Sequence, residues 1–229
     1  MNKTTDFPAA QFDQAGLNRQ HVFALDALPP ELRATLGDTS AFRQLILLGH
    51  GGKRLWTCVK AADLPGEHPI DDYTIKIVNR VFATHFADHK YRILYPGDTP
   101  VGLQQLGAQA GWHHPSPFML GIDREFGSWF AYRAAVLADT DFSPFLPVDR
   151  STPCTTCASR PCITHCPADA LANGFSLNKC ISYRQQATSL CRHTCLARLN
   201  CPVGVEHRYD EDQMRHTYAL SLKAIEQYS

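Results

Sequence analysis

The stretch CTTCASRPCITHCP, residues 154–167, places four cysteines within thirteen residues and ends on a proline. A second cysteine-rich run follows and ends on Cys201-Pro202. Thiolates hold iron–sulfur clusters because soft sulfur matches iron, and short gaps let one loop wrap three corners of a cubane. The stretch therefore predicts 4Fe-4S ligation in the C-terminal part of the chain.

The proline after the last cysteine of each run indicates how the ligands divide. In the two-cluster bacterial pattern, the cysteine before proline ligates the cluster of the other run. The gaps are two, four and three residues in the first run, and the second run has gaps of three and five, so both depart from the usual two, two and three. Crossing the ligands nevertheless uses all eight thiols. It predicts one cluster on Cys154, Cys157, Cys162 and Cys201, and another on Cys166, Cys180, Cys191 and Cys195.

Structural zinc is the main alternative, because zinc also uses closed sites of four cysteines. Zinc sites usually pair two short-gap cysteines with two more across a longer spacer and need no proline after the last ligand. The spacing here favours iron. His165 and His193 lie among the ligands and either replace a thiol at one corner, are solvated, or donate hydrogen bonds to cluster sulfur.

Composition narrows the class of partner and the compartment. Lys+Arg and Asp+Glu are both 22, so the balance of charge does not favour nucleic acid as a partner. The first residues, MNKTTDFPAAQFDQAG, lack the blocks of a secretory signal, and no stretch is long and apolar enough to span a membrane. We expect a soluble, cytoplasmic protein whose thiols are reduced, which favours metal or redox chemistry over disulfides.

Cysteine content divides the chain into two regions. Only Cys58 lies in the first 153 residues, and residues 144–153 contain three prolines without periodicity, which is typical of a linker. We place the boundary near Val148. This predicts a cofactor-binding domain over 1–147 and a small cluster domain with a C-terminal helix over 148–229.

The N-terminal region alternates strand and helix patterns, which indicates an α+β fold rather than a doubly wound parallel sheet. The expected elements are a hairpin of strands 45–48 and 54–59, a helix over 71–89, a strand at 91–95, a helix over about 101–110, and a second hairpin of 118–122 with 128–138. In the C-terminal region, only 181–190 and 210–228 look helical.

The order of motifs resembles a known family. The stretch LQQLGAQAGWHHPSPFMLGIDREFGSWFAYRAAVLAD (103–139), followed by the cysteine runs and KCISY (179–183), resembles epoxyqueuosine reductase, a cobalamin-dependent iron–sulfur enzyme. The segment FGSWFAYRAAVL is also similar to the cobalamin-processing chaperone of the cblC type. The match covers about residues 90–201.

This resemblance implies a nitroreductase-like or cblC-like α+β domain that binds cobalamin, followed by a ferredoxin-like domain with two 4Fe-4S clusters. The implied function is an oxidoreductase that delivers low-potential electrons through the clusters to a corrinoid, for corrinoid processing or reduction of a small-molecule substrate. Flavodoxin or ferredoxin would be the electron donor. The alternatives are an FMN-dependent iron–sulfur reductase and a non-catalytic ferredoxin-like carrier.

This chain departs from the epoxyqueuosine reductase pattern in two places, at its C-terminal end and at the aspartate motif. Epoxyqueuosine reductases continue well beyond the clusters with helical repeats that help engage tRNA, whereas the sequence here ends after one helix, so we do not expect nucleic acid as a partner. Their proton-donating aspartate stands in an Asp-Ser/Thr-Ala-Pro setting, whereas this chain has Asp98-Thr99-Pro100, one residue shorter. Asp98 is therefore either a general acid or a cap of the following helix.

The remaining candidates are cofactor-binding residues near the middle of the chain, each with a structural alternative. The resemblance makes Gly127, Ser128, Trp129 and Phe130 candidates for the corrinoid face, although an aromatic pair at a strand start is as often core. His113 and His114 could approach cobalt or be solvated. Arg133 lies in an apolar strand and must find an anion, either a cofactor group or an internal carboxylate. Cys58 is most simply a small buried apolar residue.

Overall fold

The structure, a computed structural model, describes residues 6–146 and 151–228. Contacts divide the chain into two compact units, the first formed by residues 1–111 and 130–149 and the second by 112–129 and 150–229. Residues 112–129, which the sequence analysis assigned to the N-terminal region, thus group with the cysteine-rich residues. The expected boundary residue, Val148, lies outside the described residues.

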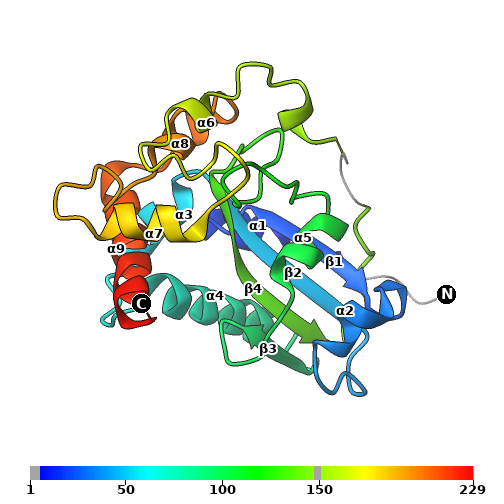
Figure 1. Cartoon of the computed structure of the whole chain (residues 1–229). Helices are drawn as coiled ribbons and strands as arrows, with labels where there is room; N and C mark the ends of the chain where they lie inside the picture. The colour runs from blue at the N-terminus through cyan, green and yellow to red at the C-terminus, as the bar shows by residue number, and fades with distance from the viewer. Residues whose placement is uncertain (1–5, 147–150, 229) are drawn as a thin grey trace. The chain divides into compact units, whose positions relative to one another are not determined.

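Within the described residues, the first unit is a mixed α+β unit built on a four-stranded sheet, and Figure 1 labels its helices and strands. Its strands are β1 (Arg19–Ala24), β2 (Gln44–Gly51), β3 (Tyr91–Tyr95) and β4 (Phe130–Ala138). Its helices are α1 (Ala9–Gln14), the 3-10 turn η1 (Leu25–Ala27), α2 (Pro30–Ala34), α3 (Arg54–Ala62), α4 (Pro69–His85) and α5 (Leu103–Gln109).

The strands form one antiparallel sheet in the order β1-β2-β4-β3. Every residue of β2 is buried, because β2 has a neighbour on both edges and helices on both faces. The apolar run LILL (45–48) is the pattern expected for such a central strand. The α+β class with an antiparallel sheet is therefore confirmed.

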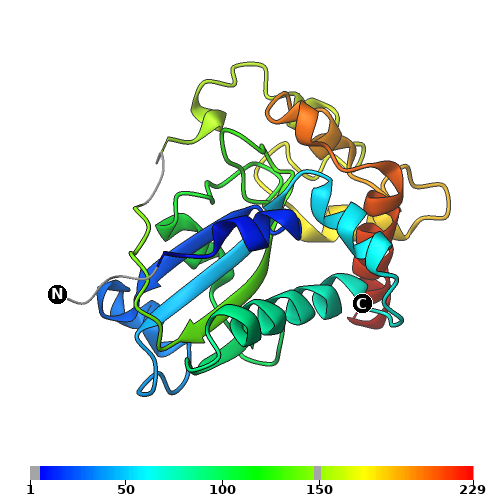
Figure 2. The ribbon, with the colours of Figure 1, turned by 180° about the vertical axis from the view of Figure 1, so that it is seen from behind.

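Helices cover both faces of the sheet (Figures 1 and 2). One face packs against α1, α3 and α4 through a core that includes Val22, Ile46 and Val136. The other carries α2 and α5, and α5 approaches β4 so closely that a Cβ built on Gly107 would lie 1.8 Å from the Tyr132 hydroxyl. Glycine at 107 is thus required by packing.

The helix expected over 71–89 is present as α4, and its pattern explains why. Pro69 occupies the first turn, where no backbone donor is needed, and Asp71 and Asp72 lie at the positive end of the helix dipole. Ile77 and Val78 are buried on one face. The strand at 91–95 and the helix before Gly111 are also present, as β3 and α5.

Both predicted hairpins are wrong. Residues 54–59 form the first turns of α3, with Leu55, Trp56 and Val59 buried at helical spacing, because β2 already pairs with β1 and β4 and has no free edge. Strand β1 was not expected. In the second predicted hairpin, residues 118–122 form no strand and contribute only an isolated bridge between His114 and Ile122. Strand β4 instead pairs with β2 and β3.

The second unit contains short helices joined by long irregular segments. They are η2 (Pro153–Thr155), α6 (Pro161–Thr164), α7 (Leu177–Gln185), α8 (Leu196–Leu199), η3 (Val205–His207) and α9 (Glu211–Tyr228). The helix expected over 181–190 begins earlier, at Leu177, because Ser176 accepts a hydrogen bond from the backbone N–H of Lys179 and caps it. The final helix agrees with the expected one.

The second unit has a small apolar core that includes cysteine side chains. Phe118, Leu171 and Ala197 pack around Cys162, and Cys166 and Cys195 lie against the same cluster. A unit this poor in apolar contacts gains much of its stability from a bound group if it holds one. None of the helices in the described ranges has the length and apolar character needed to cross a bilayer.

We expect Gln44 to be a structural residue of the first unit. Its buried amide donates to the Phe142 carbonyl at 2.7 Å and accepts from the Thr140 hydroxyl at 2.9 Å and the Phe142 N–H at 3.0 Å. Gln44→Ala leaves these groups unpaired, which should lower the free energy of unfolding by about 3 kcal/mol. Denaturation of the exposed variant Gln104→Ala is the control, and equal midpoints for the two variants would contradict this role.

Candidate functional site

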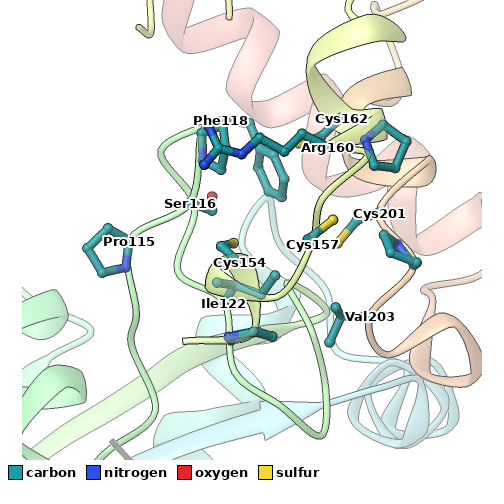
Figure 3. Close-up of a pocket in the computed structure, with 14 residues that line it drawn as sticks. Pro115, Ser116, Phe118, Ile122, Cys154, Cys157, Arg160, Cys162, Cys201 and Val203 are labelled. Carbon is teal, nitrogen blue, oxygen red and sulfur yellow. The ribbon is translucent and has the colours of Figure 1, made fainter. Parts of the chain in front are cut away.

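All four thiols of the first set line one cavity of about 190 Å³ in the second unit. Cys154 lies in η2, Cys157 follows it, Cys162 lies in α6 and Cys201 follows α8. Residues of the 112–129 segment, among them Phe118, complete the wall, and Figure 3 shows Cys157 and Cys201 side by side. The structure therefore brings together the three cysteines of the first run and the last cysteine of the second.

The environment of these thiols resists ionisation. Burial raises the pKa of the Cys162 thiol, and the other thiols of its set, Cys201 foremost, raise it further. Burial likewise raises the pKa of Cys201, as do Cys154 and Cys157. Since each thiolate disfavours the next, all four can ionise together only if a bound cation compensates their charge.

The remaining four cysteines influence one another in the same way. Burial raises the pKa of Cys191, and the nearby thiols of Cys195, Cys166 and Cys180 raise it further. Burial also raises the pKa of Cys180, with Cys195 and Cys166 acting in the same direction. These partners are the members of the second predicted set, so the two sets are distinct groups of neighbours. Their role as metal ligands stays a prediction.

Two glycines allow Cys201 to reach the first run. Gly127 has φ 57° and Gly204 has φ 65°, which favour glycine, and the two chain segments cross at this point. A Cβ on Gly127 would lie 2.2 Å from the Val203 carbonyl oxygen, and one on Gly204 would lie 2.4 Å from the Phe126 carbonyl carbon. This crossing fixes the loop that follows Cys201 against the 126–127 turn.

The sequence analysis missed the arginines around the thiols. The charges of Arg160 and Arg208 act on Cys154 and Cys201, against the burial that raises the pKa of both thiols. The Nε of Arg208 is buried and has no hydrogen-bond acceptor among the described residues. This N–H group lies near a thiol and lacks an acceptor. A bound group, such as an iron–sulfur cluster with its sulfur atoms, would supply that acceptor. Arginine in a cysteine-rich loop gives no signal of burial in the sequence.

The cofactor-binding candidates of the second unit contact one another or the cysteine segment. Ser128 is buried and accepts from Arg198 at its carbonyl, 2.6 Å, and at its hydroxyl, 3.2 Å. Trp129 is fully buried under the same guanidinium. Burial and the neighbouring His114 lower the pKa of His113. A corrinoid role for these residues stays a prediction.

Arg133 occupies a β-bulge of the first unit. Leu48 pairs with Ala134 and Gly49 with Tyr132, so Arg133 has no partner across the sheet. Its Nε instead donates to Nδ1 of the fully buried His50 at 3.0 Å, which requires that this ring nitrogen carry no proton. The partner is thus a neutral imidazole rather than the carboxylate that was considered, and the terminal guanidinium nitrogens make no hydrogen bond within the described residues.

Tyr95 lies near Arg133 and was not singled out from the sequence. Burial raises the pKa of the Tyr95 hydroxyl, while the Arg133 charge acts in the opposite direction. Phe130, at the start of β4, is buried under the guanidinium of Arg19 at 5.0 Å from the ring centre. The first unit thus gathers a cation, a phenol and a neutral imidazole at one end of the sheet.

The remaining candidates are less constrained. Asp98 is exposed, and α5 begins after Gly102 without a side-chain cap, so Asp98 does not cap that helix. Its role as an acid stays a prediction. Cys58 is half-buried on α3 beside the first unit's core. His165 is exposed, with Nδ1 2.9 Å from the Pro161 carbonyl, and His193 is exposed as well.

As the side chains stand, no group of three or more histidine, cysteine, aspartate or glutamate residues within 6–146 and 151–228 forms a ready metal site. No family model matches the chain, and none of the curated proteins matches it.

Solved structures do share the fold. Epoxyqueuosine reductase from Bacillus subtilis has a TM-score of 0.54 at 11% identity, covering 88% of this chain and 66% of that one. The Streptococcus thermophilus enzyme has a TM-score of 0.51 at 12% identity, covering 85% and 64%. A reductive dehalogenase, whose structure suggests a mechanism for B12-dependent dehalogenation, has a TM-score of 0.52 at 15% identity. The match covers 92% of this chain and 33% of the dehalogenase.

At these identities the likeness concerns the fold alone. The chain spans about two thirds of the epoxyqueuosine reductases and one third of the dehalogenase. The expected relation to the epoxyqueuosine reductase fold is thus confirmed at the level of architecture. Similarity to the cblC-type chaperone and the presence of a two-cluster ferredoxin domain remain expectations from the sequence.

We expect Gly204→Ala to disturb the first thiol set. The added Cβ would clash with the Phe126 backbone and move the segment that follows Cys201. Gly174→Ala is the matched control, because Gly174 also has a positive φ, 90°, but a Cβ there meets no atom within 4 Å. Gly204→Ala should bind less iron and melt at a lower temperature than Gly174→Ala. Equal iron content and melting temperature would show that the crossing does not position Cys201.

Proposed function

We propose that this chain is a cobalamin-linked iron–sulfur reductase. Its cysteine-rich unit would hold two 4Fe-4S clusters, and the α+β unit would bind a corrinoid. The observation that carries the proposal is the gathering of Cys201 with Cys154, Cys157 and Cys162 around one cavity, which matches the crossed ligand pattern of two-cluster ferredoxins. The shared fold with B12-related reductases supports the second cofactor.

The open arrangement of the thiols favours a cluster over zinc. The four thiols of the first set line a cavity and do not converge on one point, whereas a structural zinc site closes tightly around a single ion. The donor set, four thiols without a carboxylate, is also the one that iron–sulfur clusters use.

The chain's own residues would divide the work. Thiolates of the two sets would hold the clusters, and buried arginines would offset part of the negative charge. In the first unit, the free guanidinium nitrogens of Arg133 would donate to amide or phosphate oxygens of a corrinoid. Bound clusters would supply single low-potential electrons, and a bound corrinoid would supply the reacting cobalt.

The partners follow from the same proposal. A reduced flavodoxin or ferredoxin would donate the electrons, and a corrinoid or small molecule would accept them. One structure that shares the fold, at 12% identity and a TM-score of 0.51, holds an epoxyqueuosine-modified tRNA stem loop. The formal net charge of this chain is zero, and a neutral chain offers little of the electrostatic attraction on which tRNA binding depends. We therefore propose a small substrate rather than tRNA.

Metal and cofactor can be tested in one experiment. Anaerobically reconstituted protein should contain about eight iron atoms per chain if both cubanes form, and it should change the visible spectrum of added hydroxocobalamin in a saturable way. Arg133→Gln should weaken this binding about tenfold, the effect expected for the loss of a charged hydrogen bond. Arg33→Gln, which changes an exposed arginine, is the control.

Each result that contradicts the proposal would indicate a different function. Stoichiometric zinc in place of iron would refute the clusters. An unchanged corrin spectrum at high cobalamin concentration would refute the corrinoid, and a yellow protein that retains FMN on purification would indicate a flavin reductase instead. Reversible reduction without binding of either cofactor would indicate a ferredoxin-like carrier.

A further inference from the structure

Two arginines of the second unit are buried without an acidic partner. Arg184 is 8% exposed to solvent and Arg198 is 7% exposed. Arg184 donates to the carbonyl oxygens of Cys191 and Tyr218, both at 3.2 Å, and to the Ser221 hydroxyl at 3.0 Å. Every one of these acceptors is neutral. Neither arginine pairs with a carboxylate within the described residues.

Arg198 is held in a similarly neutral environment. Its guanidinium lies 4.1 Å from the ring centre of Trp129 and 4.9 Å from that of Tyr209, and it donates to both oxygens of Ser128. These contacts fix its position, but they do not neutralise its charge. Burying a guanidinium in this way is costly unless an anion lies nearby.

The groups that could supply negative charge near these arginines are the thiols of the second set. Arg184 follows Cys180 by about one helical turn on α7, so the two residues share a face of that helix, and its Nε donates to the Cys191 carbonyl oxygen at 3.2 Å. Arg198 lies in α8, which begins directly after Cys195. The ring centre of Tyr218, a neutral phenol, lies 5.3 Å from the Arg184 guanidinium.

Other cations of the same segments are neutralised elsewhere. Arg192 follows Cys191 directly, yet its side chain pairs with Glu226 at 3.9 Å and is partly exposed. Lys179 precedes Cys180 and pairs with Asp169 at 3.0 Å at the surface. Proximity in sequence to a cysteine thus does not explain the buried, carboxylate-free state of Arg184 and Arg198.

We propose that Arg184 and Arg198 form a buried cationic pair that raises the reduction potential of the cluster held by Cys166, Cys180, Cys191 and Cys195. A cluster with four thiolate ligands is anionic and gains one more negative charge on reduction. A fixed positive charge in a poorly solvated site stabilises the reduced state more than the oxidised state. The inference rests on the proposed function, because it requires an iron–sulfur cluster at these thiols.

The test is a potentiometric titration followed by electron paramagnetic resonance on full-length, reconstituted variants. The second cluster is identified as the signal that survives in Cys154→Ala. In Arg198→Gln and in Arg184→Gln, the ratio of reduced to oxidised second cluster at a fixed potential should fall at least tenfold, which is 59 mV for one electron. The first cluster should titrate as in the wild type.

Two further variants separate charge from structure. Arg198→Lys keeps the positive charge and should retain most of the wild-type potential. Arg192→Gln removes a charge that Glu226 and solvent already offset, so it should leave the potential unchanged. If Arg198→Gln fails to assemble a cluster because the contact with Ser128 is lost, Arg184→Gln and Arg198→Lys decide the question.

The proposal is overturned if the Gln variants that assemble a full complement of iron titrate like the wild type, or if Arg192→Gln shifts the potential as much as they do. Wild-type protein without a reducible iron signal would be a different result. It would refute the proposed function itself, before any variant is compared.

Discussion

Four thiols that share a buried space cannot all ionise unless a cation joins them. In this protein burial raises the pKa of Cys162 and Cys201, and their neighbours in the same set raise it further. In the second set, burial and the neighbouring thiols likewise raise the pKa of Cys180 and Cys191. In a metal-free chain these thiols therefore stay protonated and neutral, and they ionise together only when a bound metal group takes the thiolates as ligands. The small apolar core of the second unit fits the same dependence.

The fold supplies this arrangement through a few close contacts rather than through regular secondary structure. Gly127 and Gly204 let two segments cross at backbone distance, which sets the path of the chain beyond Cys201. Arg198 then ties the same 127–129 region to α8, between the cysteines of the two sets. Residues 112–129 of the stretch that carries the family resemblance therefore lie with the cysteine segment in one unit.

The sequence predicts periodic elements better than it predicts strand pairing. The helix at α4 and the strand at β3 follow from apolar spacing, and the gathering of Cys201 with the first run agrees with the crossed pattern, whereas ligation by the eight thiols stays a prediction. Both hairpins fail because a strand's partners depend on distant segments: β2 takes β1 and β4, so residues 54–59 become helical. The buried arginines could not be predicted, since burial of Arg184 and Arg198 depends on Ser221, Tyr218 and Ser128, which lie far away in the chain.

The central claim is that the thiols act as two crossed sets, and Cys201 tests it most directly. Paramagnetic resonance spectra and iron contents of reconstituted Cys201→Ala, Cys154→Ala and Cys180→Ala would be compared under anaerobic conditions. Because Cys201 shares the cavity of Cys154, we predict that Cys201→Ala loses the same signal as Cys154→Ala and keeps the one that Cys180→Ala loses. A Cys201→Ala spectrum that matches Cys180→Ala instead would contradict the account.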